Sequence, residues 1–259
     1  MTPFFRQAKI ANIIRQKNRV TVNELAESLN ISKETIRRDL TALEKIGKAQ
    51  KYHGGASLPT ATGEGPFGQR MGENVEAKVH VAAEAVNLVS PGETIFIDTG
   101  STTLYFAEKL AELSNLTVIT NSAEIARIIS LSPVESQAFL LGGMFKGGNR
   151  QTVGNIAISQ IRSFRAHHTI LTIGALDTLT GVMDYSIEEA QIARAMIEQA
   201  ESLTIIADSS KFGRIASFKV CGLDRITNLV CDQYPSEKMK SALLEANINI
   251  ICANQQNTF

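Results

Sequence analysis

The stretch RVTVNELAESLNISKETIRRDLTALEKIGKAQKYHGGA, residues 19–56, decides the fold of the N-terminal part of the chain. Thr21 and Glu24 have the Thr-x-x-Glu spacing of a capping box, which predicts the start of a short helix. Ser32 predicts the start of a second helix, because its hydroxyl can accept a hydrogen bond from the first turn. Two helices joined by a tight turn form a helix-turn-helix, whose second helix enters the major groove of DNA.

The second of these helices has an apolar stripe and a polar face. Ile36, Leu40 and Leu43 recur at helical spacing and are predicted to face a core. Residues 3–17 are predicted to form one more helix, and the segment after the second helix is predicted to form a wing. We therefore expect DNA contacts from the following outward side chains: Ser32, Lys33, Thr35, Arg37 and Arg38 of the helix, and Lys51 and His53 of the wing.

Charge is distributed unevenly along the chain, although the formal net charge of all 259 residues is zero. Residues 1–58 hold eleven Lys or Arg and five Asp or Glu, a net charge of +6, and the remaining residues carry −6. Adjacent arginines such as Arg37 and Arg38 are often only a solvated helix face. A basic head on an acidic body, however, is typical of a protein that binds nucleic acid through one of its parts.

The run SKETIRRDLTALEKIG, followed by HGGA, resembles the DeoR family of bacterial transcriptional regulators. The pairing of TIRRDL with HGGA about a dozen residues later is a specific motif. Members of the family often carry Arg two residues before this histidine, where the present chain has Lys51. A lysine can still neutralise a phosphate, but it cannot make the bidentate contact of an arginine.

The composition argues against several classes of protein. No apolar run approaches the length of a membrane-spanning helix, and the N-terminus has no apolar core of a secretory signal peptide. Cys221, Cys231 and Cys252 lack Cys-x-x-Cys spacing and are predicted to be reduced, buried thiols. The four histidines form no recognisable metal pattern. We expect a cytoplasmic protein without a metal or a cofactor.

Three parts are predicted along the chain: a winged helix-turn-helix domain over residues 1–57, a linker over 58–74 and a sensor domain over 75–259. The linker is rich in Pro, Gly and Thr and poor in aliphatic residues. Beyond it, short apolar runs alternate with helical segments, which predicts an α/β fold with a mostly parallel sheet. The predicted strands are residues 94–98, 116–120, 137–141, 169–173, 203–207, 226–231 and 248–252.

Polar and glycine residues collect directly after these strands, where open α/β sheets bind their ligands. Three hydroxyl residues follow Asp98 and Gly100 and begin the next helix: Ser101, Thr102 and Thr103. Free N–H groups, the helix dipole and these hydroxyls suit a phosphate, although they also suit an ordinary strand-to-helix turn. Lys211, after the fifth strand, favours the phosphate site because its charge can neutralise the anion.

The resemblance to the DeoR family continues in this domain and covers residues 6 to 253. It rests on Asp-x-Gly-Ser-Thr at 98–102, Thr-Asn at 120–121, Leu-Gly-Gly at 141–143, Glu-Glu-Ala at 188–190 and Asp-x-Ser-Lys-Phe-Gly at 208–213. The family's sensor domain is similar in fold to ribose-5-phosphate isomerase and to CoA transferases. The resemblance implies a phosphorylated sugar or polyol as effector. Together with the reading of the residues, it predicts that the effector is bound by Asp98, Gly100, Ser101, Thr102, Thr103, Asn121, Gly142, Gly143, Asp177, Glu188 and Lys211.

Either Glu188 or Glu189 could face the effector. Both could instead be solvent-exposed, because acidic residues are common in the first turn of a helix. The favoured hypothesis is a repressor of a carbohydrate catabolic operon, released from duplex operator DNA by a phosphorylated sugar or polyol. We also expect a homo-oligomer, a dimer or tetramer, because one short recognition helix makes few base contacts. The alternative is an isomerase-like enzyme with an added DNA-binding head, for which a helix-turn-helix has no evident use.

Overall fold

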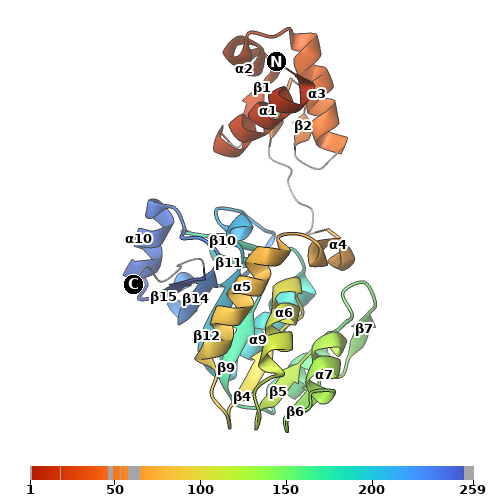
Figure 1. The fold of residues 1–259 in the computed structure, drawn as a ribbon, viewed down its shortest axis with the longest axis vertical. Coiled ribbons are helices and arrows are strands. Elements are labelled where there is room, and N and C mark those ends of the chain that lie inside the picture. Colours follow the sequence, from red (N-terminus) through yellow and green to blue (C-terminus); the bar gives the residue numbers. More distant parts are fainter. Residues whose placement is uncertain (1, 18, 46–48, 53, 58–64, 254–259) are drawn as a thin grey trace. The chain divides into compact units, whose positions relative to one another are not determined.

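The chain forms two compact units, Met1–Thr62 and Gly63–Phe259, each with its own hydrophobic core (Figure 1). They are described from a computed structural model, which covers residues 2–17, 19–45, 49–52, 54–57 and 65–253. In the described residues no helix is both long enough and apolar enough to cross a membrane.

The N-terminal unit is a winged helix-turn-helix, as predicted. Its helices are α1 (Pro3–Lys17), α2 (Val22–Leu29) and α3 (Lys33–Lys45). Its strands β1 (Arg19–Thr21), β2 (Gln50–Tyr52) and β3 (Gly55–Ser57) form an antiparallel sheet in the order β1-β3-β2. The apolar stripe of α3 is buried against α1 and α2, and this contact leaves the opposite side of α3 open.

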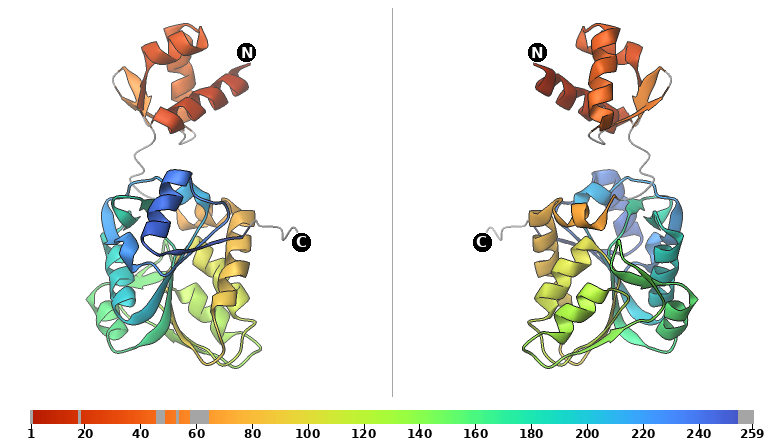
Figure 2. Two further views of the ribbon diagram at one scale, coloured as in Figure 1. Left: turned by 90° about the vertical axis from the view of Figure 1, so that its left-hand side faces the viewer. Right: turned by 90° about the vertical axis from the view of Figure 1, so that its right-hand side faces the viewer.

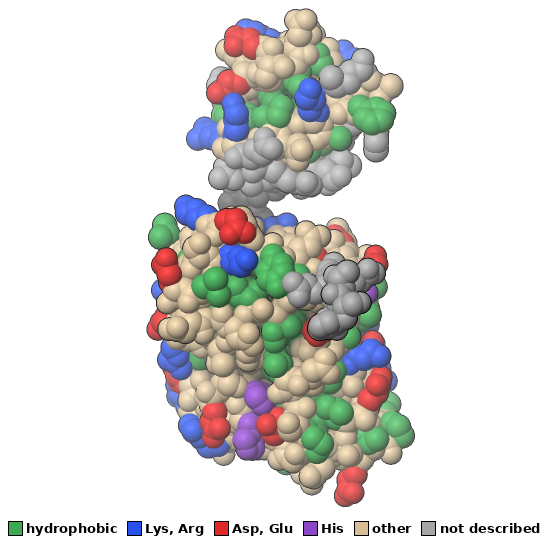
Figure 3. Space-filling model, turned by 60° about the vertical axis from the view of Figure 1, so that its left-hand side comes forward, with side chains coloured by type: hydrophobic (Ala, Val, Ile, Leu, Met, Phe, Trp, Pro, Cys, Tyr) green, Lys and Arg blue, Asp and Glu red, His purple; other side chains and the backbone are tan. Residues whose placement is uncertain are grey.

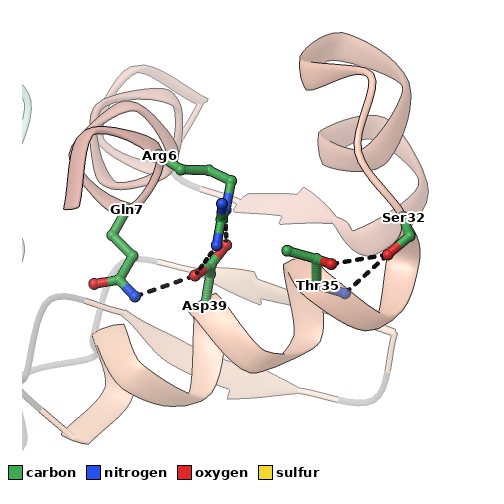
Figure 4. Close-up of polar contacts among 5 residues, drawn as sticks. All are labelled: Arg6, Gln7, Ser32, Thr35 and Asp39. Atoms are coloured by element: carbon green, nitrogen blue, oxygen red, sulfur yellow. Dashed lines mark hydrogen bonds and ion pairs between the residues drawn. The ribbon is translucent and has the colours of Figure 1, made fainter. Parts of the chain in front are cut away.

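Capping residues define both helices of the motif. The Thr21 backbone N–H donates to Glu24 Oε2 over 2.7 Å, and the Glu24 N–H donates to Thr21 Oγ1 over 3.1 Å, which is the predicted capping box. Asn30 ends α2 in the left-handed conformation, with φ of 53°. The Thr35 N–H then donates to Ser32 Oγ over 3.2 Å at the start of α3 (Figure 4).

A seven-stranded, all-parallel sheet forms the centre of the C-terminal unit, in the order β15-β14-β12-β9-β4-β5-β6. Each strand overlaps one of the apolar runs predicted from the sequence, although β9 and β12 begin three residues before the predicted start. The strands are β4 (Thr94–Ile97), β5 (Thr117–Thr120), β6 (Gln137–Leu140), β9 (Ala166–Leu171), β12 (Ala200–Ala207), β14 (Asn228–Cys231) and β15 (Asn249–Cys252).

Helices cover both faces of this sheet (Figure 2). Alternate residues of a strand point to opposite faces, so Ile95 and Ile97 lie in one core and Phe96 lies in the other. The first core also contains α5 (Val75–Ala85), α6 (Ser101–Leu110) and α7 (Ala123–Ser130). The second core contains α8 (Asn155–Ile161), α9 (Ile187–Glu198) and α10 (Glu237–Glu245). This arrangement leaves the carboxyl ends of the strands open between the two helical layers.

Two small antiparallel elements were not predicted. Strands β10 (Ala175–Asp177), β11 (Gly181–Asp184) and β13 (Phe218–Cys221) form a sheet of their own. The glycine-rich segment after β6 contains a hairpin of β7 (Met144–Lys146) and β8 (Gln151–Val153). These strands are only three or four residues long, too short for a two-residue period to stand out in the sequence.

Part of the predicted linker is folded. Residues 58–64 lie outside the described part of the chain, but Phe67–Met71 form a short helix, α4. Phe67 is buried, and the hydroxyl of Tyr105 on α6 donates to the Met71 carbonyl over 3.0 Å. The low aliphatic content of the segment favoured a linker, whereas a single phenylalanine provides the apolar contact that holds α4 in place.

The three cysteines are free thiols, as expected; Cys221 and Cys231 are buried, whereas Cys252, which was also predicted to be buried, is half-buried. Burial raises the pKa of the Cys221 thiol to about 11 and that of Cys231 to about 12, so both remain protonated at neutral pH. Acidic and basic side chains are intermixed on the face of the C-terminal unit seen in Figure 3. The net negative charge of this unit therefore forms no single acidic patch on that face.

Candidate functional site

The exposed side of α3 is the candidate DNA-binding surface. Its orientation is set by Asp39, which is only 3% exposed and accepts hydrogen bonds from two residues of α1 (Figure 4). Arg6 Nη2 lies 3.1 Å from Asp39 Oδ1, and Gln7 Nε2 lies 3.1 Å from the same oxygen. A second contact joins Arg6 Nε to Asp39 Oδ2. Asp39 therefore ties α3 to α1.

The predicted DNA-contacting residues lie mostly on this open surface. Ser32, Lys33, Arg37 and Arg38 are exposed, and Thr35 is half-buried with its hydroxyl 2.9 Å from that of Ser32. The ammonium of Lys51 on β2 donates to Thr41 Oγ1 of α3 over 2.9 Å, so the wing and the recognition helix meet there. His53 lies outside the described residues.

The C-terminal unit contains a polar cavity of about 280 Å³ at the carboxyl edge of the sheet. Its walls come from α4, the start of α5, the start of α6 and the loop after β12. Four basic and two acidic side chains line it, which gives a formal charge of +2. The lining residues are Arg70, Glu73, Asn74, Lys78, Ser101, Asp208, Ser210, Lys211 and Arg214.

Lys78 is the most deeply buried base of this cavity, with 3% of its surface exposed. Its Nζ donates to the carbonyl oxygen of Arg70, so α5 is joined to α4. Burial lowers the pKa of Lys78, the negative charge of Asp208 opposes this shift, and the positive charges of Lys211 and Arg70 add to it. The protonated form of Lys78 would therefore be stabilised by an anion in the cavity.

Asp208 connects two walls of the cavity, the start of α5 and the loop after β12. Its Oδ1 accepts a hydrogen bond from Asn74 Nδ2 over 3.2 Å and one from the Ser210 N–H over 3.0 Å. These contacts hold the short 3₁₀ helix Ser209–Lys211 beside the start of α5. Lys211 is thus placed on the same cavity as Ser101, the first residue of α6.

The loop between β4 and α6 is packed tightly against the neighbouring strand. A Cβ atom at Gly100 would lie 2.0 Å from Thr172 Cγ2, so only glycine fits there. Asp98 Oδ1 accepts from the Thr172 N–H over 3.1 Å, and Thr103 Oγ1 donates to the Asp98 carbonyl over 2.9 Å. Thr102 is buried in the same turn. These residues shape the loop that presents Ser101 and do not themselves line the cavity.

A second polar cluster extends from the end of β5 to α9. Asn121 accepts from Thr99 Oγ1 over 3.3 Å and donates to Gln151 Oε1 over 3.2 Å. Glu189 Oε1 accepts from Asn149 Nδ2 and from Gln151 Nε2. Glu189, rather than Glu188, therefore belongs to the inward side of α9.

Two of the predicted effector contacts, Glu188 and Asp177, make contacts away from the cavity. Glu188 pairs with Lys146 Nζ at 3.0 Å on the surface. Asp177 accepts from the Leu179 and Thr180 N–H groups in the β10–β11 turn; burial raises its pKa, but these hydrogen bonds more than offset that effect, so its pKa is lowered.

Two glycines, Gly142 and Gly143, are the remaining predicted effector contacts. The Gly142 N–H donates to Gln160 Oε1 over 2.7 Å. Gly143 has φ of 138°, and a Cβ atom there would lie 2.7 Å from the Val153 carbonyl oxygen.

The structure thus brings Ser101 and Lys211 of the predicted set to the cavity, and it adds cavity residues that the sequence analysis missed. Arg70, Glu73 and Asn74 were missed because they lie in the predicted linker, and Arg214 gave no signal. Lys78 could have been found, since it shares the helical stripe of Val81, Ala82 and Ala85. A lysine on a buried stripe is rare unless it is paired.

Two family descriptions match the chain. The "DeoR-like helix-turn-helix domain" matches residues 6–62, and the "DeoR C terminal sensor domain" matches residues 73–233. The chain belongs to the DeoR family.

DeoR-family relatives match the chain over nearly its whole length. The "HTH-type transcriptional regulator GolR" of Listeria innocua is 31% identical over 96% of this chain and 98% of its own length. The "Glycerol-3-phosphate regulon repressor" of Escherichia coli is 28% identical, over 95% of this chain and 97% of its own.

Among solved structures, ribose 5-phosphate isomerase A from Methanocaldococcus jannaschii is 19% identical, with a TM-score of 0.40 over 54% of this chain and 55% of that chain. In the described residues of this DeoR-family chain, no three His, Cys, Asp or Glu side chains are grouped to hold a metal ion.

Proposed function

We propose that this DeoR-family protein is a transcriptional repressor that binds duplex operator DNA in a sequence-specific manner through α3 and the wing. The observation that carries the proposal is the exposed row of Lys33, Arg37 and Arg38 on α3, in a basic unit of helix-turn-helix fold. The DNA-binding part comprises residues 1–57, and the sensor part follows the connection after it.

The effector in this proposal is a phosphorylated sugar or polyol bound in the sensor unit. The formal charge of +2 around the cavity suits a phosphate monoester, which carries about −1.5 to −2 at neutral pH. Ser101 and the N-terminus of α6 offer hydrogen-bond donors beside Lys211. A relative named for the glycerol-3-phosphate regulon supports a phosphorylated polyol and a carbohydrate catabolic operon.

Binding of the effector releases the protein from DNA, because a catabolic operon is needed when its intermediate accumulates. The protein acts in the cytoplasm, as a homo-oligomer that presents two recognition helices to a two-fold operator. It binds its ligand without turnover and needs no cofactor. Its relatives support this role, since they are transcriptional regulators and repressors over nearly the full length of the chain.

Selection of duplexes from a random DNA library with the full-length protein tests the DNA-binding part of the proposal. We expect one enriched sequence with two-fold symmetry, and no enrichment over the starting library would contradict it. The enriched duplex is then titrated with a panel of phosphorylated and unphosphorylated sugars and polyols. A phosphorylated compound should release the DNA, and its unphosphorylated counterpart should not.

Two measurements test the oligomeric state and the absence of enzymatic turnover. Light scattering with operator DNA present should give the mass of at least a dimer, and a monomeric mass would refute the oligomer. Incubation with ribose 5-phosphate should yield no ribulose 5-phosphate, whereas turnover would favour the isomerase-like alternative.

A further inference from the structure

We propose that the phosphate of the effector is held by Arg70 and Lys78 as well as by Lys211, and that the ligand thereby fixes helix α4 to the sensor unit. This inference rests on the proposed function, because it needs an anion in the cavity. It adds a regulatory consequence, since α4 begins only a few residues after the segment that joins the sensor unit to the DNA-binding unit.

Helix α4 depends on contacts rather than on its own stability. It is five residues long, and a helix of this length does not persist in water without tertiary packing. The buried Phe67 ring, the Tyr105 hydroxyl on the Met71 carbonyl and the Lys78 ammonium on the Arg70 carbonyl are among the contacts that hold it to the sensor unit. A ligand that binds α4 directly adds a charge-assisted contact to these.

Arg70 is positioned to be that link. Its side chain is 8% exposed and lines the cavity, with Cζ 5.5 Å from the centre of the Phe67 ring. At this distance the guanidinium gains a cation–π attraction to the ring, and its planar fork of donors suits bidentate recognition of a phosphate. Arg70 therefore contacts both the proposed ligand site and the Phe67 ring, which packs α4 against the sensor unit.

The charges around the cavity favour the binding of an anion. The positive charges of Lys211 and Arg70 act against the protonated form of Lys78 in this cavity, while the negative charges of Asp208 and Glu73 act in its favour and leave a formal charge of +2. A phosphate between the three bases replaces this repulsion with attraction, and the gain is larger because Lys78 is shielded from water. Glu73 and Asp208 disfavour a second anionic group, so the ligand class is a monophosphate rather than a bisphosphate.

The test uses inorganic phosphate as the probe on the full-length protein. Binding is measured by ³¹P NMR, and hydrogen exchange of residues 65–78 is compared in saturating phosphate and in chloride of equal ionic strength. We expect phosphate to slow exchange in this segment at least about tenfold, as for a gain of one charge-assisted contact. Arg70→Gln should weaken phosphate binding by roughly 10- to 150-fold and abolish the protection of α4.

Arg214→Gln is the matched control, because Arg214 lines the same cavity but does not belong to α4. This variant should weaken phosphate binding yet keep the protection of α4 once phosphate is saturating. Arg70→Lys, which keeps the charge, should restore part of both effects and so separates ligand contact from a loss of packing.

The results distinguish a failure of this inference from a failure of the proposed function. Wild-type affinity for phosphate in Arg70→Gln, or phosphate binding without protection of residues 65–78, overturns this inference and leaves the proposed function intact. If the wild-type protein binds neither phosphate nor any phosphorylated sugar or polyol, the effector site of the proposed function fails, and this inference fails with it.

Discussion

Asp39, the acidic residue directly after Arg37 and Arg38, accepts hydrogen bonds from Arg6 of α1, with Arg6 Nη2 3.1 Å from Asp39 Oδ1. The acid in the TIRRDL motif is thus a structural residue, whereas the arginines before it point to solvent. One short run of sequence holds the recognition helix in place and supplies its outward charges.

Asp39→Ala should destabilise the N-terminal unit, because it leaves the partly buried guanidinium of Arg6 without its carboxylate. We expect a loss of about 1–3 kcal/mol in the free energy of unfolding, measured by urea denaturation. Glu34→Ala is the control on the same helix, since Glu34 pairs with Arg37 only at the exposed surface, at 3.5 Å. It should cost less than about 1 kcal/mol. Equal stability losses in the two variants would refute the structural role of Asp39.

Arg37→Ala and Arg38→Ala should weaken operator binding. The expected loss is about 1–3 kcal/mol for an arginine that reads guanine, with relaxed preference at that base pair. An arginine that contacts only phosphate should weaken all duplexes alike and lower the salt dependence. Gel shifts at fixed salt measure this, with Arg162→Ala, an exposed arginine of the sensor unit, as the control. Unchanged affinity in the double variant would remove α3 from DNA recognition.

Lys211→Ala should shift the response to effector to a higher concentration and leave DNA binding intact. Loss of a charge-assisted contact to phosphate costs about 1.5–3 kcal/mol, which is one to two decades in effector affinity. Operator binding is titrated with the active phosphorylated compound. Lys146→Ala is the control, because Lys146 pairs with Glu188 away from the cavity. A Lys211→Ala protein that responds at the wild-type concentration would show that the phosphate site has been misplaced.

Gly100→Ala should destabilise the sensor unit through a clash rather than through backbone strain. The residue has an extended φ of −167°, but its Cβ would lie 2.0 Å from Thr172 Cγ2. Overpacking of this kind costs about 1–3 kcal/mol. Thr172→Ser removes the clashing methyl group and should recover much of the loss in the double variant. Urea denaturation of the four proteins forms a double-mutant cycle, and strictly additive losses would contradict the predicted contact.

Lys78 should make the stability of the sensor unit depend on pH. Burial lowers its pKa in the folded state below the ordinary value of 10.5, so the unfolded chain binds more protons between the two pKa values. The stability contributed by this site therefore rises as the pH rises through the folded pKa towards 10.5. The difference in unfolding free energy between wild type and Lys78→Met should shift in favour of the wild type over that range. A difference that stays constant with pH would contradict the lowered pKa.

The sequence predicted the central architecture because its signals are local and repeated. Apolar runs such as those at β4 and β12 mark buried parallel strands, and Thr21 with Glu24 marks a helix start. The candidate cavity was predicted only at Ser101 and Lys211, which follow strands and so meet at one edge of the sheet. Arg70 lies outside that rule, because its position depends on how Phe67 packs, and no periodic pattern reports that contact.

The hydrogen bond between Asn74 and Asp208 joins residues 134 positions apart. The ribosome therefore completes the helix-turn-helix unit first, and then the α4–α5 wall of the cavity, long before the opposite wall emerges with the loop after β12. A nascent chain acquires its helix-turn-helix before it can acquire the cavity in which we propose that the effector binds. Under the proposed function, translation that stopped short of residue 208 would yield a DNA-binding unit that no ligand releases.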